Sequence, residues 1–334
     1  MQADWIPCAP QRLCLGDFTL ESGAVLEDFE LSYVVHRSDV AARKPPVLVL
    51  CAIGSSHHRL DFLIGPGRAL DPVQRCIVVV DAIGNGLTTS PSTAERQHGF
   101  TFPRFTIRDM VHSQKALMDV LGFPVIDVVG ASMGGMQALQ WAVSYPLAVS
   151  RVAAMTPTAR TTAWSAAMNH AMRSALQAAL RPGQPTAVQA EALESWCALM
   201  HLLCTQTPAQ VDAALGPASA LPDWLKKRSQ WLVEQGFDAI DWIYQSHAYD
   251  AHDVGTTPGF GGDTAAALAS ISAEVLISAP ATDLYNPVHA AEWARQHIAG
   301  CRWDALPGEG HIAATAADPL TAAHLNVVLA DFLA

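Results

Sequence analysis

The chain has 334 residues, half of them hydrophobic and only 15% charged, which suits one large α/β domain with an insertion, or two domains. Its formal net charge of −11 argues against nucleic acid and against a membrane surface as partners, because both are bound mainly through lysine and arginine. No apolar run approaches the roughly 18 residues that span a bilayer, Met1–Trp5 lacks the start of a signal peptide, and the seven cysteines form no Cys-x-x-Cys pair. We therefore expect a cytoplasmic protein without a zinc site.

The first predicted elements are strands. Residues 13–35 alternate between apolar and polar side chains around the turn Glu21-Ser22-Gly23, which predicts an antiparallel hairpin at a sheet edge. Short apolar runs follow, separated by helical patterns, and such runs suit strands that are buried on both faces. They cover residues 47–50, 76–80, 125–129, 152–155, 275–278 and 301–303. Strands that alternate with helices predict an α/β fold with a mostly parallel sheet covered by helices on both faces.

One of these strands ends at a sequence that suits a nucleophile. Residues 107–121 carry apolar side chains at helical spacing, residues 125–129 form an apolar run, and Gly130-Ala131-Ser132-Met133-Gly134 follows. Helix, strand, Gly-x-Ser-x-Gly and a further helix is the arrangement of the nucleophile elbow, a tight turn that lifts the serine hydroxyl out of the sheet. The glycines are required because a side chain beside the serine would collide with neighbouring backbone. Ser132 is therefore the predicted nucleophile of an α/β-hydrolase fold.

The pattern changes between residues 158 and 263, where no strand pattern is found. Four helical segments are expected there: 158–180, 186–203, 208–215 and 222–235. Breakers such as Pro182-Gly183 separate them. We predict a core domain of residues 1–157 and 264–334, with residues 158–263 inserted as a helical lid over the sheet. Four tryptophans of this lid are expected to be packing residues: Trp164, Trp196, Trp224 and Trp231.

A serine hydroxyl needs a base that takes its proton, and in this fold the acid and the histidine follow the serine along the chain. Asp283 follows the predicted strand 275–278, and His311 follows the last predicted strand after a glycine-rich turn. Both loops lie at the carboxyl ends of parallel strands, where open α/β sheets place their sites. The predicted triad is therefore Ser132, Asp283 and His311.

The members of this triad also have structural interpretations. One histidine among thirteen is more often a surface or core residue than a catalytic one. Asp283 could cap a helix that begins near Pro287. Asp241 and Asp253 are weaker candidates for the acid.

The tetrahedral intermediate of acyl transfer carries an oxyanion, which needs two preorganised N–H donors. One is expected to be the backbone N–H of Met133, directly after the nucleophile, and the other that of Ile53, in the loop after the predicted strand 47–50. His57 and His58 lie nearby, but adjacent histidines project in different directions and no Cys or acidic ligand set accompanies them. This chemistry requires neither a metal nor a cofactor.

Four short stretches carry a family likeness. They are residues 65–71 (GPGRALD), 105–111 (FTIRDMV), 130–141 (GASMGGMQALQW) and 252–255 (HDVG). With them, the chain from about Leu13 to Leu333 resembles the homoserine O-acetyltransferase family of α/β-hydrolase-fold enzymes. The TIRDMV and SMGGMQ segments are specific to that family rather than to the fold.

The resemblance implies Ser132, Asp283 and His311 as the triad, a helical lid, and often a homodimer formed through the lid. Family members transfer an acyl group from acyl-CoA to a hydroxyl through an acyl-serine. Arg173 matches the arginine that holds the carboxylate of the acceptor, a role that suits a planar guanidinium with two parallel donors. The alternative for Arg173 is a solvent-facing position in the lid.

The chain also departs from the family pattern. Ile312 stands where the family has an aspartate that binds the homoserine amino group, and an isoleucine cannot pair with an ammonium. Residues 81–91 resemble the Asp-x-x-Gly-x-Gly loop of ordinary α/β hydrolases, and residues 51–55 read CAIGS in place of the family's HALTG. These departures argue against homoserine as the acceptor.

Together these features predict a hydrolase, an esterase of small acyl esters in which water resolves the acyl-serine. The alternative is an acyl-CoA-dependent O-acyltransferase with an acceptor other than homoserine, since both reactions use the same catalytic residues. A third interpretation is a non-catalytic ligand-binding protein on the same scaffold, which would not need a complete triad. In each case the expected partner is a small molecule.

Overall fold

The computed structural model describes residues 8–37, 44–180, 186–314 and 319–334. Met1–Trp5 and the predicted breaker Pro182-Gly183 lie outside these residues. Among the described residues, no helix combines the length and the apolar character needed to cross a membrane.

An eight-stranded sheet forms the centre of the molecule, in the order β1-β2-β4-β3-β5-β6-β7-β8. Its strands are β1 (Gln11–Thr19), β2 (Val25–His36), β3 (Val47–Leu50), β4 (Ile77–Val80), β5 (Ile126–Ala131), β6 (Val149–Met155), β7 (Glu274–Ala279) and β8 (Arg302–Ala305). Strand β2 pairs antiparallel with both β1 and β4, and every other neighbouring pair is parallel. The predicted edge hairpin and the predicted α/β-hydrolase fold class are therefore confirmed.

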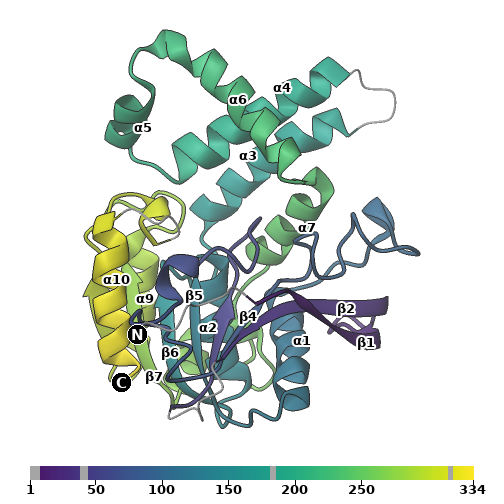
Figure 1. Cartoon of the computed structure of the whole chain (residues 1–334). Coiled ribbons are helices and arrows are strands. Elements are labelled where there is room, and N and C mark those ends of the chain that lie inside the picture. Colours follow the sequence, from purple (N-terminus) through teal and green to yellow (C-terminus); the bar gives the residue numbers. More distant parts are fainter. Residues whose placement is uncertain (1–7, 38–43, 181–185, 315–318) are drawn as a thin grey trace.

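Helices cover both faces of this sheet, as Figure 1 shows. Those outside residues 158–263 are α1 (Ile107–Val120), α2 (Met133–Ser144), α8 (Thr264–Ala269), α9 (Val288–His297) and α10 (Pro319–Phe332). Successive side chains of an inner strand point to opposite faces. In β3, Leu48 and Leu50 accordingly join the core formed with α1 and α2, whereas Val47 and Val49 join the core formed with α10.

The described residues between 158 and 263 are mostly helical and lie above the sheet in Figure 1, drawn in teal and green. They form α3 (Ala163–Ala179), α4 (Thr186–Cys197), the π-helical segment η3 (Ala198–Cys204), α5 (Pro208–Leu215), α6 (Leu221–Glu234) and α7 (Ala239–Asp250). The division into a core domain and a lid, and the homodimer through the lid, stay predictions.

Two details of this helical part correct the sequence analysis. Helix α3 begins at Ala163 rather than at residue 158, because the Thr162 side chain accepts a hydrogen bond from the N–H of Ser165 and caps the helix there. Helix α7 was not predicted, since it is buried on nearly all sides and shows no polar stripe. Trp164 and Trp231 are also more exposed than expected, at 55% and 44%.

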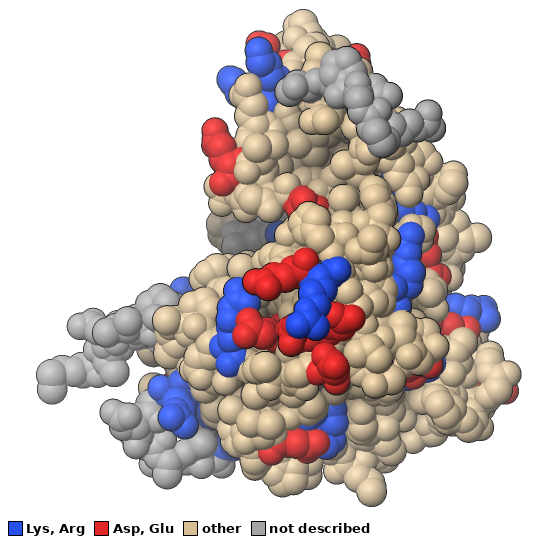
Figure 2. Space-filling model, turned by 90° about the vertical axis from the view of Figure 1, so that its right-hand side faces the viewer, with Lys and Arg blue, Asp and Glu red and all other residues tan. Residues whose placement is uncertain are grey.

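The surface beside the β1–β2 hairpin mixes the two signs of charge. Figure 2 shows a group of acidic and basic side chains lying side by side near the middle of this face, with smaller charged groups elsewhere on it. Exposed pairs include Arg12 with Glu30 at 3.0 Å, both on the hairpin, and Glu27 of the hairpin with Arg96 of the segment after β4 at 3.4 Å. Such exposed pairs contribute little to stability.

Candidate active site

The turn at Ser132 has the geometry of a nucleophile elbow. Ser132 lies between β5 and α2 with a φ of +58°, a conformation that L-residues rarely adopt. A Cβ on Gly130 would lie 2.2 Å from the carbonyl oxygen of Gly134, and one on Gly134 would lie 2.4 Å from that of Leu50. Both glycines are therefore required by close backbone contacts, as predicted.

The structure brings Ser132, His311 and Asp283 together from three separate loops. His311 Nε2 lies 2.8 Å from Ser132 Oγ, and His311 Nδ1 lies 2.8 Å from Asp283 Oδ2. All three side chains are buried. Because β5, β7 and β8 are parallel, their carboxyl ends meet at one sheet edge, and each strand delivers one of these residues there.

Asp283 combines the two roles that the sequence left open. Its Oδ1 accepts the backbone N–H groups of Tyr285 and Asn286, each at 2.8 Å, while Oδ2 faces His311. It therefore closes the turn before α9 and contacts the imidazole at the same time. Three acceptor contacts hold the carboxylate in one orientation.

A pair of stacked tyrosines lies on one side of the histidine. The ring of Tyr285 lies edge-on to that of His311 at 5.1 Å, and Tyr249 stacks on Tyr285 at 5.4 Å. The Tyr249 hydroxyl donates to Asn286 Oδ1, and burial raises its pKa, so that it stays protonated. Tyr249 comes from α7, which the sequence analysis missed, so its position beside the triad was also missed.

The two predicted oxyanion donors lie on adjoining segments. Met133 is the first residue of α2, and Ile53 follows β3. Gln137 Nε2 of α2 donates to the Cys51 carbonyl oxygen at 3.1 Å, which ties the loop after β3 to the start of the helix. Neither the Ile53 nor the Met133 N–H donates to another described residue. Both amides are therefore available beside the positive end of the helix dipole.

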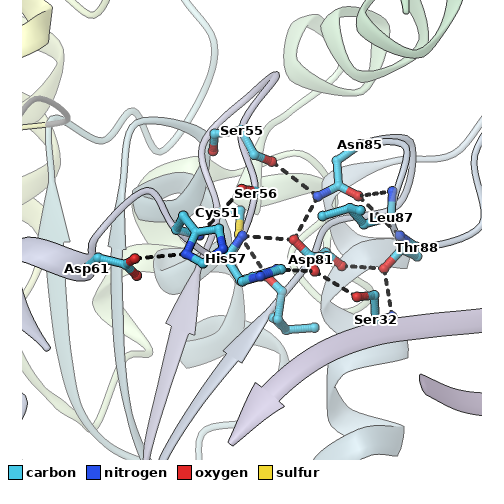
Figure 3. A network of polar contacts seen from close by, with 12 residues as sticks. Ser32, Cys51, Ser55, Ser56, His57, Asp61, Asp81, Asn85, Leu87 and Thr88 are labelled. Atoms are coloured by element: carbon cyan, nitrogen blue, oxygen red, sulfur yellow. Dashed lines mark hydrogen bonds and ion pairs between the residues drawn. The ribbon is translucent and has the colours of Figure 1, made fainter. Parts of the chain in front are cut away.

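A buried polar network holds the loop that carries Ile53 (Figure 3). Asp81, at the end of β4, accepts the backbone N–H of His57 at 2.9 Å, and its Oδ2 lies 2.8 Å from His57 Nδ1. Asn85 Nδ2 donates to Asp81 Oδ1 at 3.0 Å and to the Ser55 carbonyl oxygen at 3.1 Å. Asp81 is fully buried, and its hydrogen bond raises the pKa of His57.

The sequence analysis considered His57 and His58 together and did not find this network. His58 is exposed and pairs with Asp61 instead. Asp81 opens the Asp-x-x-Gly-x-Gly loop, which was the one available signal for a partner of His57.

His57→Ala is expected to lower kcat by roughly 10- to 100-fold with a smaller effect on KM, because displacing Ile53, the predicted oxyanion donor, would weaken transition-state binding more than substrate binding. Steady-state kinetics on a neutral acetyl ester measures this, with melting temperatures recorded in parallel. His58→Ala is the matched control and should leave both constants unchanged. Equal losses of kcat in the two variants would show that His57 does not support the oxyanion loop.

The two weaker acid candidates have structural roles. Asp241 accepts hydrogen bonds from the Ser92 N–H at 2.8 Å and the Ser92 hydroxyl at 2.5 Å, and burial raises its pKa to about 6. Asp253 accepts the N–H of Gly255 at 2.8 Å and the Thr264 hydroxyl at 2.7 Å. The only carboxylate of a described residue that is hydrogen-bonded to His311 is that of Asp283.

Arg173 on α3 is buried and already paired. Its Nη2 lies 2.5 Å from Asp250 Oδ2, and its Nη1 donates to Ser246 Oγ at 3.1 Å. Asn169 Nδ2 donates to the other oxygen of Asp250 at 2.7 Å. The solvent-facing alternative for Arg173 is therefore wrong, and its binding of a substrate carboxylate stays a prediction.

The fold and the elbow at Ser132 define the class of protein: the chain is an enzyme of the α/β-hydrolase superfamily. A family model described as the alpha/beta hydrolase fold matches residues 45–314. Within this class the chain belongs to the homoserine O-acetyltransferase-like family. It is 32% identical to the homoserine O-acetyltransferase of Nostoc punctiforme over 301 residues, which cover 83% of each chain. The resemblance inferred from the sequence is confirmed.

Solved structures of both esterases and acetyltransferases share the fold. The acetyl esterase MekB superposes with a TM-score of 0.88 at 26% identity, over 97% of this chain and 96% of that chain. The homoserine O-acetyltransferase from Bacillus anthracis superposes with a TM-score of 0.81 at 20% identity, over 98% of each chain, and this match concerns the fold alone. The superfamily assignment therefore covers both acyl transfer and ester hydrolysis.

Proposed function

We propose that the chain is an esterase of small acyl esters that works through an acyl-enzyme on Ser132. His311 takes the proton of the Ser132 hydroxyl as this attacks the ester carbonyl, and returns it to the leaving alkoxide. Asp283 holds the imidazole in the tautomer that can accept this proton, and stabilises the imidazolium. The contact of 2.8 Å between His311 Nε2 and Ser132 Oγ is the observation that carries this proposal.

The oxyanion of each tetrahedral intermediate is bound by the N–H groups of Ile53 and Met133. These donors are fixed before the reaction begins, and a preorganised donor of this kind typically contributes about 3 to 4 kcal/mol to transition-state stabilisation. In the second half of the reaction, His311 takes a proton from water, and the resulting hydroxide attacks the acyl carbon. Ser132 is released as the free hydroxyl, with its proton supplied by His311.

Two observations favour water over an amino-acid hydroxyl as the acceptor. The guanidinium of Arg173 is neutralised by Asp250, so that a carboxylate acceptor would have to compete with an internal ion pair. Ile312, directly after His311, offers no counter-charge to an acceptor ammonium. The similarity to the acetyl esterase MekB also favours water as the acceptor.

Acyl-CoA-dependent O-acyl transfer is the second candidate, because curated relatives at about 30% identity are named homoserine O-acetyltransferase. The two functions share every catalytic step up to the acyl-serine. They differ only in the nucleophile that reaches it.

Product analysis separates them. The enzyme is incubated with acetyl-CoA or a small acetate ester, together with a panel of hydroxy acids and hydroxy amino acids, and free acetate and O-acetyl products are followed over time. We expect free acetate to be the main product with every acceptor. Formation of an O-acetyl product faster than free acetate would overturn the hydrolase assignment in favour of transfer.

A further inference from the structure

Four buried N–H groups of neighbouring side chains have no acceptor among the described residues. They are the indole Nε1 of Trp196 and of Trp242, His201 Nε2 and Arg228 Nε. The Trp196 ring lies 5.4 Å from that of Trp242 and 5.3 Å from that of His201. Buried donors nearly always find an acceptor in native proteins, so a group of four without one requires an explanation.

The tautomer of the His201 ring makes its Nε2 a hydrogen-bond donor as well. Its Nδ1 lies 3.5 Å from Arg228 Nη2, a cation that can only donate. Burial, with Arg228 and Arg59 nearby, lowers the pKa of His201 to about 3, so the ring is neutral at pH 7. A neutral imidazole that faces a donor through Nδ1 carries its proton on Nε2. All four groups therefore need an acceptor.

Arg59 and Arg228 add positive charge to the same place. Arg59 follows the loop after β3 and Arg228 lies on α6 of the helical part, where its guanidinium stacks on Trp231 at 4.3 Å. Arg59 is exposed over part of its surface, and the protein packed around its guanidinium, together with the charge of Arg228, lowers its pKa to about 10, which still leaves it charged at neutral pH. No carboxylate of a described residue forms an ion pair with either arginine. Arg228 is near enough for its charge to lower the pKa of Arg59, and two neighbouring cations without a counter-charge repel each other.

This basic cluster, formed by Arg59, Trp196, His201, Arg228 and Trp242, adjoins the candidate active site on two sides. A Cβ on Gly54, the residue after the oxyanion donor Ile53, would lie 3.2 Å from Trp242 Cδ1.

The second contact is with the loop of the catalytic histidine. The segment that carries His201 ends at Thr205, whose carbonyl oxygen accepts the N–H of Ile312 at 3.0 Å. The cluster therefore lies between the sheet and the helices above it, next to both the oxyanion loop and the His311 loop.

We propose that the basic cluster is a subsite for an anionic group, a carboxylate or a phosphate, carried by the ester or thioester that Ser132 attacks. The inference rests on the proposed function. An anion supplies what the cluster lacks, since its oxygens accept from the indole, imidazole and guanidinium N–H groups, and its charge offsets both arginines. The preferred substrates are thus anionic esters rather than neutral ones.

The test compares specificity across matched acyl donors. The neutral donor is p-nitrophenyl acetate. Two anionic esters are compared with it: 4-acetoxybenzoate, which carries its charge on the leaving group, and p-nitrophenyl hemisuccinate, which carries its charge on the acyl group. Among thioesters, anionic acetyl-CoA is compared with S-acetylpantetheine, which lacks the phosphates. Variants are Arg59→Gln and Arg228→Gln, with Lys227→Gln, an exposed lysine on the same helix, as the control for a change of net charge.

For each anionic donor, kcat/KM is divided by the kcat/KM of its neutral counterpart. We expect this ratio to fall about 10-fold or more in both arginine variants for at least one anionic donor. The donor that responds identifies which part of the substrate carries the anion. In Lys227→Gln the ratio should be unchanged. Equal ratios in the parent and in both arginine variants, for every donor, would overturn the proposal.

A binding measurement tests the subsite independently of catalysis. Inorganic phosphate should raise the melting temperature of the parent protein and of Ser132→Ala, but not that of Arg59→Gln. An equal rise in Arg59→Gln, or none in the parent, would contradict the subsite. If the parent protein hydrolysed no ester at all, the proposed function would be contradicted. The phosphate measurement would then still decide, by itself, whether the basic cluster binds an anion.

Discussion

Ser132→Ala is expected to lower kcat for a small acetyl ester by about 10⁴-fold or more, because the acyl-enzyme can no longer form and only the oxyanion donors and substrate binding remain. Alanine keeps the Cβ that Ser132 already holds at a φ of +58°, so the turn should be preserved. Initial rates with p-nitrophenyl acetate measure the effect. The burst of p-nitrophenol in the first turnover should disappear as well.

Thermal unfolding provides the control for this variant. A melting temperature within a few degrees of the parent shows that the loss is chemical rather than structural. A folded variant that retains more than about a tenth of the parent activity would exclude Ser132 as the nucleophile.

Asp283→Asn is the second change with a large expected effect, a loss of about 10⁴-fold in kcat. The amide can still accept the N–H groups of Tyr285 and Asn286, but its NH₂ group opposite His311 Nδ1 favours the tautomer in which Nε2 carries the proton. In that tautomer His311 cannot take the proton of Ser132. The kcat of the variant is compared with that of the parent on the same ester.

Asp241→Asn is the matched control, since it makes the same substitution at another buried carboxylate that was a candidate for the acid. Its kcat should stay within a few fold of the parent value. A larger loss in Asp241→Asn than in Asp283→Asn would reassign the acid of the triad.

The sequence was sufficient for the features that depend on local pattern. The apolar runs located the strands, and the Gly-x-Ser-x-Gly turn between a strand and a helix located Ser132. Chain order in this fold then singled out Asp283 and His311 among many acids and histidines, and the structure brings their side chains within hydrogen-bond distance. The three side chains meet because parallel strands place their carboxyl ends at one edge of the sheet, and their catalytic roles stay predictions.

What could not be predicted depends on contacts between distant segments. Helix α7 lacks an amphipathic pattern because its sides are buried against different parts of the molecule, and with it the positions of Tyr249 and Trp242 were missed. The pairing of Arg173 with Asp250 joins two helices, α3 and α7, and a single residue pattern does not reveal such a partner.

The same reason explains why the roles of two histidines, His57 and His201, were not predicted. His57, in the loop after β3, pairs with Asp81, directly after β4, and His201 joins a group of donors drawn from several helices. In the sequence nothing distinguished His201 from a surface or core histidine, and the one signal for a partner of His57 was the Asp-x-x-Gly-x-Gly loop that Asp81 opens.

The covalent state of Ser132 during turnover is the most direct test of the proposed acyl-enzyme. The enzyme is mixed with an acetyl ester, quenched in acid before the substrate is exhausted, digested, and the peptide that contains residue 132 is analysed by tandem mass spectrometry. One acetyl group should be found on the Ser132 side chain in the parent and be absent from the corresponding peptide of Ser132→Ala. The mechanism would be contradicted if the acetyl group were found on a different side chain during turnover. It would also be contradicted if Ser132 were unmodified in samples quenched during the burst phase.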